Sequence, residues 1–181
     1  MSRFPSSLSI SPLSITLNVV RSLSLGIMAA GTVAANAADT TVSVRETVEL
    51  KASPTKTWNA INDFATWQQW HPAFAGTTMV KGEGHTKGAV RVLSTKDGGK
   101  FTEELVAYDA NLRSYKYRII ESPAPVQGYV STIEVKQTKD GSSVVWSSTF
   151  TVKPGTPEVD AKKLISGVYR AGLDNLASVV Q

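Results

Sequence analysis

Three of the four tryptophans in this chain fall within residues 53–72, and this stretch constrains the fold more than any other. It opens with Ser53, whose hydroxyl can accept a hydrogen bond from the first turn of a helix. Pro54 follows, and proline suits the first helical position, where its missing N–H costs nothing. The stretch therefore predicts a helix that begins at Pro54.

The same stretch predicts which side of this helix is buried and where it ends. Trp58, Ile61 and Ala65 are spaced three and four residues apart, so they share one face of a helix. His71 comes directly before Pro72, and the residue before a proline is disfavoured in helical backbone. We therefore expect a capped helix and a tryptophan-rich bend that ends at Trp-His-Pro and closes one end of the fold.

Most of the remaining chain has the pattern of strands. Residues 42–50 alternate apolar and polar side chains, as a strand with one buried face does. Between residues 76 and 152, strand-like runs recur about every 10 to 15 residues, separated by turns rich in Asp and Gly, which predicts an antiparallel meander. The expected strands of this meander are residues 77–83, 89–95, 100–108, 114–121, 128–137 and 143–153.

The C-terminal segment predicts one long helix. Thr156 is the expected N-cap, with Pro157 in the first position and Glu158 near the positive end of the helix dipole. Gly167 and Gly172 each cost about 1 kcal/mol relative to alanine. They either let the helix approach the sheet or bend around a ligand, or they leave the helix slightly weak. The expected apolar stripe is Ile165, Val168, Gly172, Leu176 and Val179.

The predicted order of elements is one strand, two short helices, six strands and one long helix. We interpret this order as an α+β helix-grip fold, in which a curved antiparallel sheet of about seven strands wraps around the long C-terminal helix. A cavity is expected between the sheet and that helix. Residues 38–181 form the expected single domain.

The sequence also resembles a known superfamily over about residues 41–180. Residues 52–58, together with Asp63-Phe64, Trp67 and Trp70-His71-Pro72, are similar to the opening of the START-like, Bet v 1-related (SRPBCC) superfamily, especially its polyketide cyclase/dehydrase branch. A second set of residues resembles the exported subgroup that includes the accessory protein of bacterial methanol oxidation. These residues are 101–105, Tyr108-Asp109, 114–119, Pro125, Tyr129 and 144–146.

The resemblance implies a ligand cavity lined by alternate residues of the strands. It assigns Tyr115 and Tyr117 to the inward face, and the two-residue period of a strand adds Ile119. Tyrosine and tryptophan have an apolar body and one polar tip, so they can orient a flat hydrophobic ligand or simply fill the core. The candidate cavity residues are Trp70, His71, Glu104, Tyr115, Tyr117, Ile119, Tyr129, Trp146, Ile165, Val168 and Tyr169.

Two neighbouring carboxylates raise the question of chemistry in this cavity. Glu103 and Glu104 are adjacent on one expected strand, so only one of them can face inward. We take Glu104 as the candidate and leave the side open. Burial would raise the pKa of an inward carboxyl and suit it as a general acid or a polar hook for a ligand. The alternative that we favour is an ion pair with Arg91 or Arg118 at the sheet surface.

Other catalytic signals are weak. The chain has two histidines, His71 and His85, and no cysteine, without the close ligand spacing of zinc sites. We interpret His71 as a capping residue at a helix boundary rather than as a catalyst. We therefore expect no metal, no cofactor and no catalytic residue.

The first 37 residues have the order of a secretory signal peptide. They carry Arg3 and Arg21 but no acidic residue, then an apolar run over residues 23–35 and the small-residue site Ala35-Asn36-Ala37. The run is shorter than the ~20 apolar residues that a membrane-spanning helix needs, so we expect cleavage after Ala37 and no stable membrane anchor. Export without cysteine suits a bacterial periplasm.

The charge balance argues against a nucleic-acid partner. Loss of Arg3 and Arg21 lowers the formal net charge from +4 to +2, and the remaining lysines are scattered rather than clustered with aromatic residues. Three functions stay open. The leading one is a periplasmic, non-enzymatic binding or carrier protein for a small lipid, quinone-like or polyketide-like molecule. The alternatives are an accessory protein with a periplasmic redox protein as its partner, and a cyclase or dehydratase.

Overall fold

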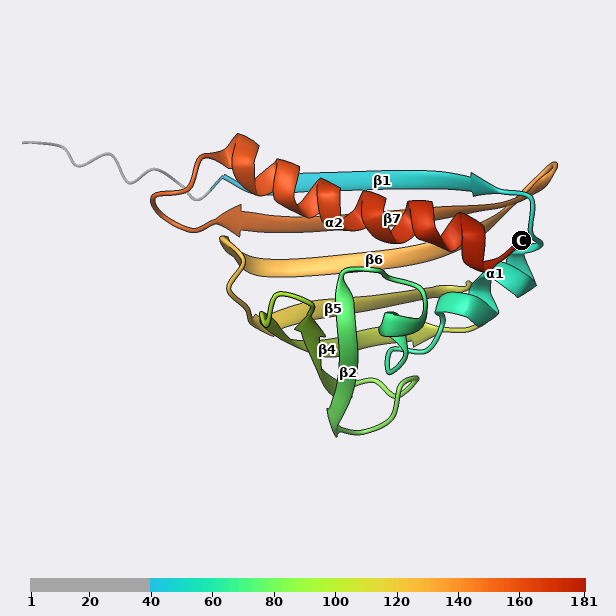
Figure 1. Ribbon diagram of the computed structural model, residues 1–181, viewed down its shortest axis with the longest axis horizontal. Helices are drawn as coiled ribbons and strands as arrows, with labels where there is room; N and C mark the ends of the chain where they lie inside the picture. Colours follow the sequence, from blue (N-terminus) through green and yellow to red (C-terminus); the bar gives the residue numbers. More distant parts are fainter. Residues whose placement is uncertain (1–39) are drawn as a thin grey trace, which may run out of the picture. The chain divides into compact units, whose positions relative to one another are not determined.

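The computed structural model describes residues 40–181, so the expected signal peptide lies outside the described residues. These residues form a seven-stranded antiparallel sheet in the order β1-β7-β6-β5-β4-β3-β2 (Figure 1). The strands are β1 (Val42–Leu50), β2 (Phe74–Lys81), β3 (Val90–Thr95), β4 (Lys100–Asp109), β5 (Ser114–Glu121), β6 (Val126–Thr138) and β7 (Gly141–Val152). The helices are α1 (Pro54–Ile61), the short 3₁₀ helix η1 (Trp67–Gln69) and α2 (Glu158–Val179).

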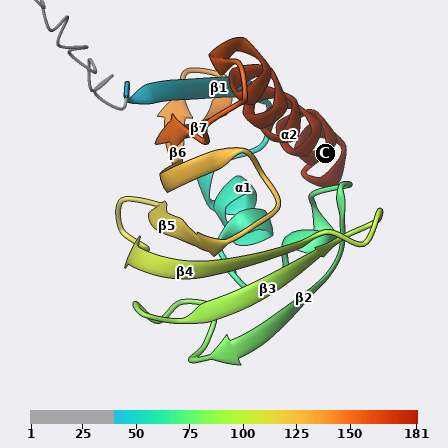
Figure 2. The same ribbon diagram turned by 90° about the vertical axis from the view of Figure 1, so that its left-hand side faces the viewer.

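The sheet curves, and α2 crosses its concave side, as Figure 2 shows. This helix packs against β1 and β7. Register shifts interrupt β2, β4 and β6, and such bulges bend a strand and increase its twist. In β6 the shift lies between Gln127 and Val130 and includes Gly128 at φ 58°, a conformation that favours glycine. The predicted α+β helix-grip fold is confirmed.

Helix α1 begins as predicted and ends earlier. Ser53 Oγ accepts a hydrogen bond of 3.2 Å from the Lys56 backbone N–H, with Pro54 at the first helical position. The helix stops at Ile61, so the expected helical face through Ala65 and the stop at His71 are wrong. The Asp63 carboxylate accepts a hydrogen bond of 2.7 Å from the Ala65 N–H and turns the chain away, which sequence periodicity does not reveal.

Helix α2 begins one residue later than predicted, because Pro157 rather than Thr156 takes the capping position in extended backbone. Ile165, Gly172 and Leu176 are buried as expected, together with Tyr169 and Leu173, and Val168 is half-buried. Val179 is exposed, contrary to the predicted stripe. It is the last helical residue, and Val180 beyond the helix fills the core instead.

The two helical glycines of α2 face different surroundings. A Cβ atom at Gly172 would lie 2.5 Å from His71 Cδ2 and 3.0 Å from a Trp70 ring carbon. Glycine there lets the helix press against the tryptophan-rich bend, as one of the two sequence interpretations held. Gly167 is exposed, with open space where its Cβ would be, so no close approach explains it. Across residues 40–181, no helix combines the length and apolarity that crossing a bilayer requires.

Candidate ligand-binding site

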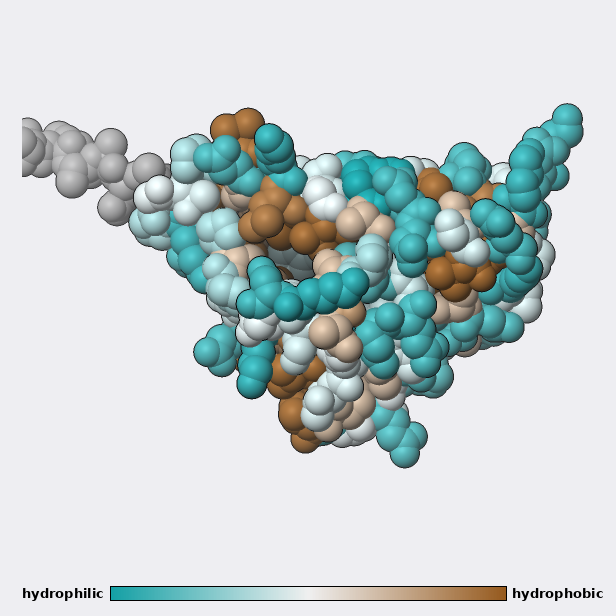
Figure 3. Space-filling model, in the orientation of Figure 1, coloured by the Kyte–Doolittle hydropathy of each residue, from teal (hydrophilic) through white to brown (hydrophobic). Residues whose placement is uncertain are grey.

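A cavity of about 450 Å³ lies between α2 and the concave side of the sheet. Figure 3 shows a hollow in the surface beside α2, with hydrophobic residues along the helix side. Aromatic and aliphatic side chains make most of the wall, and the residues around 95–99 and 123–125 complete it. A concave, largely apolar space of this size suits a small organic molecule.

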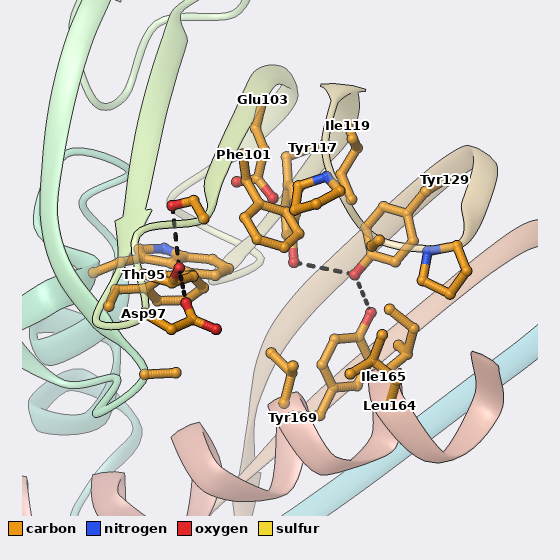
Figure 4. A pocket seen from close by; sticks show the side chains of 18 of the residues that line it. Thr95, Asp97, Phe101, Glu103, Tyr117, Ile119, Tyr129, Leu164, Ile165 and Tyr169 are labelled. Carbon is orange, nitrogen blue, oxygen red and sulfur yellow. Dashed lines mark hydrogen bonds between the residues drawn. The ribbon is translucent and has the colours of Figure 1, made fainter. Parts of the chain in front are cut away.

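Seven of the eleven candidate residues lie around this cavity. Strands supply four of them and α2 supplies the other three; Figure 4 labels five. They are Tyr117, Ile119, Tyr129, Trp146, Ile165, Val168 and Tyr169. The resemblance implied the inward face for Tyr117 on β5, and the strand period of two extended that face to Ile119.

Glu104 does not line the cavity, and this prediction needs correction. Its carboxylate points to the outer face, where Oε2 accepts hydrogen bonds of 2.9 and 2.5 Å from the Arg118 guanidinium. Glu103 faces inward instead, because adjacent residues of a strand point to opposite faces. Phe101 and Leu105 carry the signal that identifies this side, since both lie two residues from Glu103 and contribute to the apolar face.

Three further candidates are buried behind the cavity wall rather than in it. Tyr115 packs under the rings of Trp58 and Phe64, and its hydroxyl accepts a hydrogen bond of 3.1 Å from Trp67 Nε1. Trp70 and His71 lie between α2 and the core, held there by the close approach at Gly172. Trp67, which was not a candidate, takes a place in the wall, because the chain turns at residues 62–66 and brings η1 under the sheet.

His71 is a structural residue in this arrangement. Its Nε2 lies 3.0 Å from the Val168 carbonyl, and its Nδ1 accepts a 3.2 Å hydrogen bond from the Ala73 N–H. The carbonyl can only accept, so His71 must be the neutral tautomer with its proton on Nε2. Burial lowers the pKa of His71 to about 4, and the nearby Arg91 charge adds to this effect.

A chain of buried hydroxyls crosses the cavity wall. Ser131 Oγ donates 2.9 Å to the Ser147 carbonyl, so it accepts from the Tyr169 hydroxyl at 3.1 Å. Tyr169 in turn accepts from Tyr129, and the Tyr117 hydroxyl lies 3.4 Å from Tyr129. This last contact is long, so the Tyr117 proton is only weakly engaged.

The hydroxyl chain stays uncharged and can exchange hydrogen bonds with a ligand. Trp146 Nε1 donates to Tyr117 at 3.1 Å and to Ser131 at 3.0 Å, which satisfies the tryptophan's polar tip inside the core. Burial raises the pKa of Tyr117, Tyr129 and Tyr169 well above the usual range. The three tyrosines are therefore neutral at physiological pH.

A buried ion pair forms the second polar feature of the site. Arg91 of β3 lies directly opposite Glu103 of β4, and its Nε and a terminal nitrogen donate to Glu103 Oε2 at 2.9 and 2.6 Å. The remaining terminal nitrogen donates 2.7 Å to the Phe64 carbonyl. The guanidinium lies 3.7 Å from the ring centroids of both Phe64 and Trp67. Sequence reasoning treated Arg91 only as a surface partner and missed this role.

The carboxylate, not the arginine, is presented to the cavity. Arg91 is fully buried and lies behind the wall, whereas Glu103 lines the cavity (Figure 4). Burial raises the pKa of Glu103, and the Arg91 charge opposes that rise. Arginine cannot lose its proton in a protein and a buried cation needs a counter-ion, so we assign Glu103 the charged form at neutral pH.

The sequence of this chain matches one known protein family. The pattern of the family described as polyketide cyclase / dehydrase and lipid transport matches residues 41–181. The chain belongs to this family. It therefore falls within the SRPBCC superfamily, as the sequence resemblance implied. No curated protein sequence matches the chain.

Several solved structures are similar to the chain. The protein XoxI from Bacillus cereus is 32% identical, with a TM-score of 0.67 over 78% of this chain and 94% of that one. An uncharacterised protein from Bacillus thuringiensis is 30% identical, with a TM-score of 0.71 over 77% and 98%. Ara h 8.0201 is 16% identical and shares the fold, with a TM-score of 0.65 over 78% and 98%.

Proposed function

We propose that the protein binds and carries a small, predominantly apolar molecule in the cavity between α2 and the sheet. The cavity itself is the observation that carries this proposal: about 450 Å³ of space with a mainly aromatic and aliphatic wall. The family description, which includes lipid transport, agrees with it. A quinone-like or polyketide-like compound has the flat apolar shape that such walls favour.

The polar groups near the cavity support binding rather than catalysis. Both ring nitrogens of His71 are engaged by backbone groups, and its ring lies outside the cavity. The Glu103 carboxylate is tied to Arg91. A general acid must carry a proton, which the charged Glu103 does not, and the ring of His71 lies outside the cavity, so neither group is placed to act as a general acid.

A fluorescence titration with the neutral dye N-phenyl-1-naphthylamine tests the proposal. The wild-type protein should bind it at one saturable site with enhanced emission. Ile165→Trp places a large ring in the cavity and should abolish this binding. Lys163→Trp adds the same ring on the exposed side of α2 and should leave the binding unchanged. Saturable binding that survives Ile165→Trp in a folded protein, or no binding by the wild type, would contradict the proposal.

We also propose that the domain acts outside the cytoplasm. The basic, apolar and small-residue order of residues 1–37 supports export, and the absence of cysteine is compatible with it. Cell fractionation with N-terminal sequencing should find the protein in the periplasm, beginning at Ala38. Recovery of the intact N-terminus in the cytoplasm would refute the export proposal and leave the binding proposal standing.

A further inference from the structure

One oxygen of the buried ion pair has no partner. Both hydrogen bonds from Arg91 end on Glu103 Oε2, and no group within residues 40–181 donates to Oε1. The Glu103 side chain is only 5% exposed, and the cavity is the space that it lines. Oε1 is not among the fully buried side-chain atoms that lack a hydrogen-bond partner, so it is accessible from the cavity. A charged carboxylate oxygen is a strong acceptor for a donor that enters there.

A weakly engaged donor lies on the neighbouring strand. Tyr117 of β5 faces the same cavity, and its oxygen already accepts from Trp146 Nε1. Its proton reaches Tyr129 only across 3.4 Å, so a better acceptor in the cavity can compete for it. Leu105 pairs with Tyr117 and Ile119 pairs with Glu103, so the two polar groups are diagonal neighbours on adjacent strands.

The charge of this wall selects among ligands. Arg91 is screened from the cavity by its own carboxylate partner, so a ligand beside this pair meets Glu103 and not Arg91. The lysine in the cavity lining, Lys96, is exposed and follows β3 in the turn to β4. A second carboxylate beside Glu103 would be repelled and would lose its hydration, because Lys96 lies beyond the Ser94–Lys100 pair and not next to Glu103. A hydroxyl group is neutral, and it can both donate to Glu103 and accept from Tyr117.

We propose that the ligand of this cavity is an apolar alcohol or phenol whose hydroxyl donates to Glu103 Oε1 and accepts from Tyr117, and that free carboxylic acids are excluded. This inference rests on the proposed binding function and narrows the class of ligand. It assigns Glu103 a recognition role rather than a purely structural one.

Isothermal titration calorimetry at neutral pH with three matched compounds tests the inference. 2-Naphthol carries the hydroxyl, 2-methoxynaphthalene lacks the donor, and 2-naphthoate carries a negative charge. Hydrogen bonds to a charged group predict that the wild type binds 2-naphthol about 10-fold or more tightly than 2-methoxynaphthalene. 2-Naphthoate should bind most weakly of the three.

Two variants test whether Glu103 is the residue that causes the preference for 2-naphthol. Glu103→Gln should remove most of the preference for 2-naphthol, because the amide keeps its oxygen for Arg91 and turns an NH₂ donor toward the cavity. Glu104→Gln makes the same change on the outer face and should leave the preference intact. The compound series on the wild type decides the question even if Glu103→Gln fails to fold.

The outcomes separate this inference from the proposed function. Equal binding of 2-naphthol and 2-methoxynaphthalene, or tighter binding of 2-naphthoate, overturns the alcohol or phenol class and leaves a cavity-binding protein. A preference that Glu103→Gln does not change in a folded protein overturns the role of Glu103. Absence of binding by all three compounds overturns both the inference and the proposed function.

Discussion

Strand β4 carries two glutamate–arginine pairs, one residue apart, on opposite faces of the sheet. Both are cross-strand pairs in direct register, and their closest contacts are alike, 2.6 Å for Arg91–Glu103 and 2.5 Å for Arg118–Glu104. Their surroundings differ. The inner side chains are 0% and 5% exposed, whereas the outer ones are 56% and 26% exposed. The two ion pairs therefore have similar contact distances but very different exposure to solvent.

The two pairs should behave differently because only the outer one is in contact with water. Water screens the outer pair and can replace either partner, so the pair contributes little to stability. The inner pair has no such replacement, and Arg91 depends on Glu103, the Phe64 carbonyl and two aromatic rings. The same isolation leaves Glu103 Oε1 available to a ligand in the cavity.

The largest expected difference between the two pairs is in the free energy of unfolding after removal of each arginine. Arg91→Met leaves a buried carboxylate without its counter-ion and should lower the free energy of unfolding by about 3–5 kcal/mol. Arg118→Met should lower it by less than about 1 kcal/mol. Urea denaturation of both variants measures the contrast. Equal losses would show that the inner pair is not isolated from water.

A double variant separates the effect of the buried pair on stability from its effect on ligand binding. Arg91→Met combined with Glu103→Leu removes both buried charges and should recover most of the lost stability, since apolar replacement of a buried pair is often neutral. The corresponding ligand titration should still show weaker binding of 2-naphthol. Recovery of both stability and 2-naphthol binding would contradict the recognition role of Glu103.

The buried His71 adds a dependence of stability on pH. The pKa of His71 is about 4 in the folded protein and 6.5 without burial, so the unfolded chain takes up this proton first as pH falls. The stability from neutral His71 is complete above pH 6.5 and is lost between pH 6.5 and 4, by about 3 kcal/mol in total. Urea denaturation across this range should show a flatter profile of stability against pH for His71→Gln than for the wild type. Equal slopes in the two proteins would contradict the buried neutral state of His71.

The two glycines of α2 give the smallest contrast. Gly172→Ala forces a methyl group against His71 and Trp70 and should cost about 1–3 kcal/mol of stability. Gly167→Ala adds a better helix former in open space and should stabilise the protein by about 0.5–1 kcal/mol. Thermal unfolding measures both changes. A neutral Gly172→Ala would mean that the helix does not press on the bend as described.

The fold was predictable where short sequence patterns determine the local structure. The expected bounds of β1 and β5 agree with the structure, and Ser53 with Pro54 opens α1 as predicted. Each of these signals depends on a few neighbouring residues. The stop of α1 at Ile61 was missed because it depends on the Asp63 turn, and an uninterrupted apolar spacing through Ala65 masked it.

The site was predictable only in part, for a physical reason. Alternation shows that Glu103 and Glu104 face opposite sides, and the apolar neighbours Phe101 and Leu105 mark the side of Glu103 as the inner one. The burial of Arg91 depends on Phe64 and Trp67, which the turn after α1 brings beneath β3. No local sequence pattern predicts that contact. The inward position of Tyr117 was implied by the resemblance to the superfamily, and the strand period added Ile119.

The central claim is that a small apolar molecule occupies the cavity between α2 and the sheet. Two-dimensional NMR with a titrated ligand tests it most directly. Addition of 2-naphthol to ¹⁵N-labelled protein should shift the amide signals of Glu103, Tyr117, Tyr129 and Ile165, with one common saturation curve. The signals of Val80 and Lys139, which lie at exposed positions, should stay in place. Shifts confined to exposed positions, or no saturable shifts at all, would contradict the account.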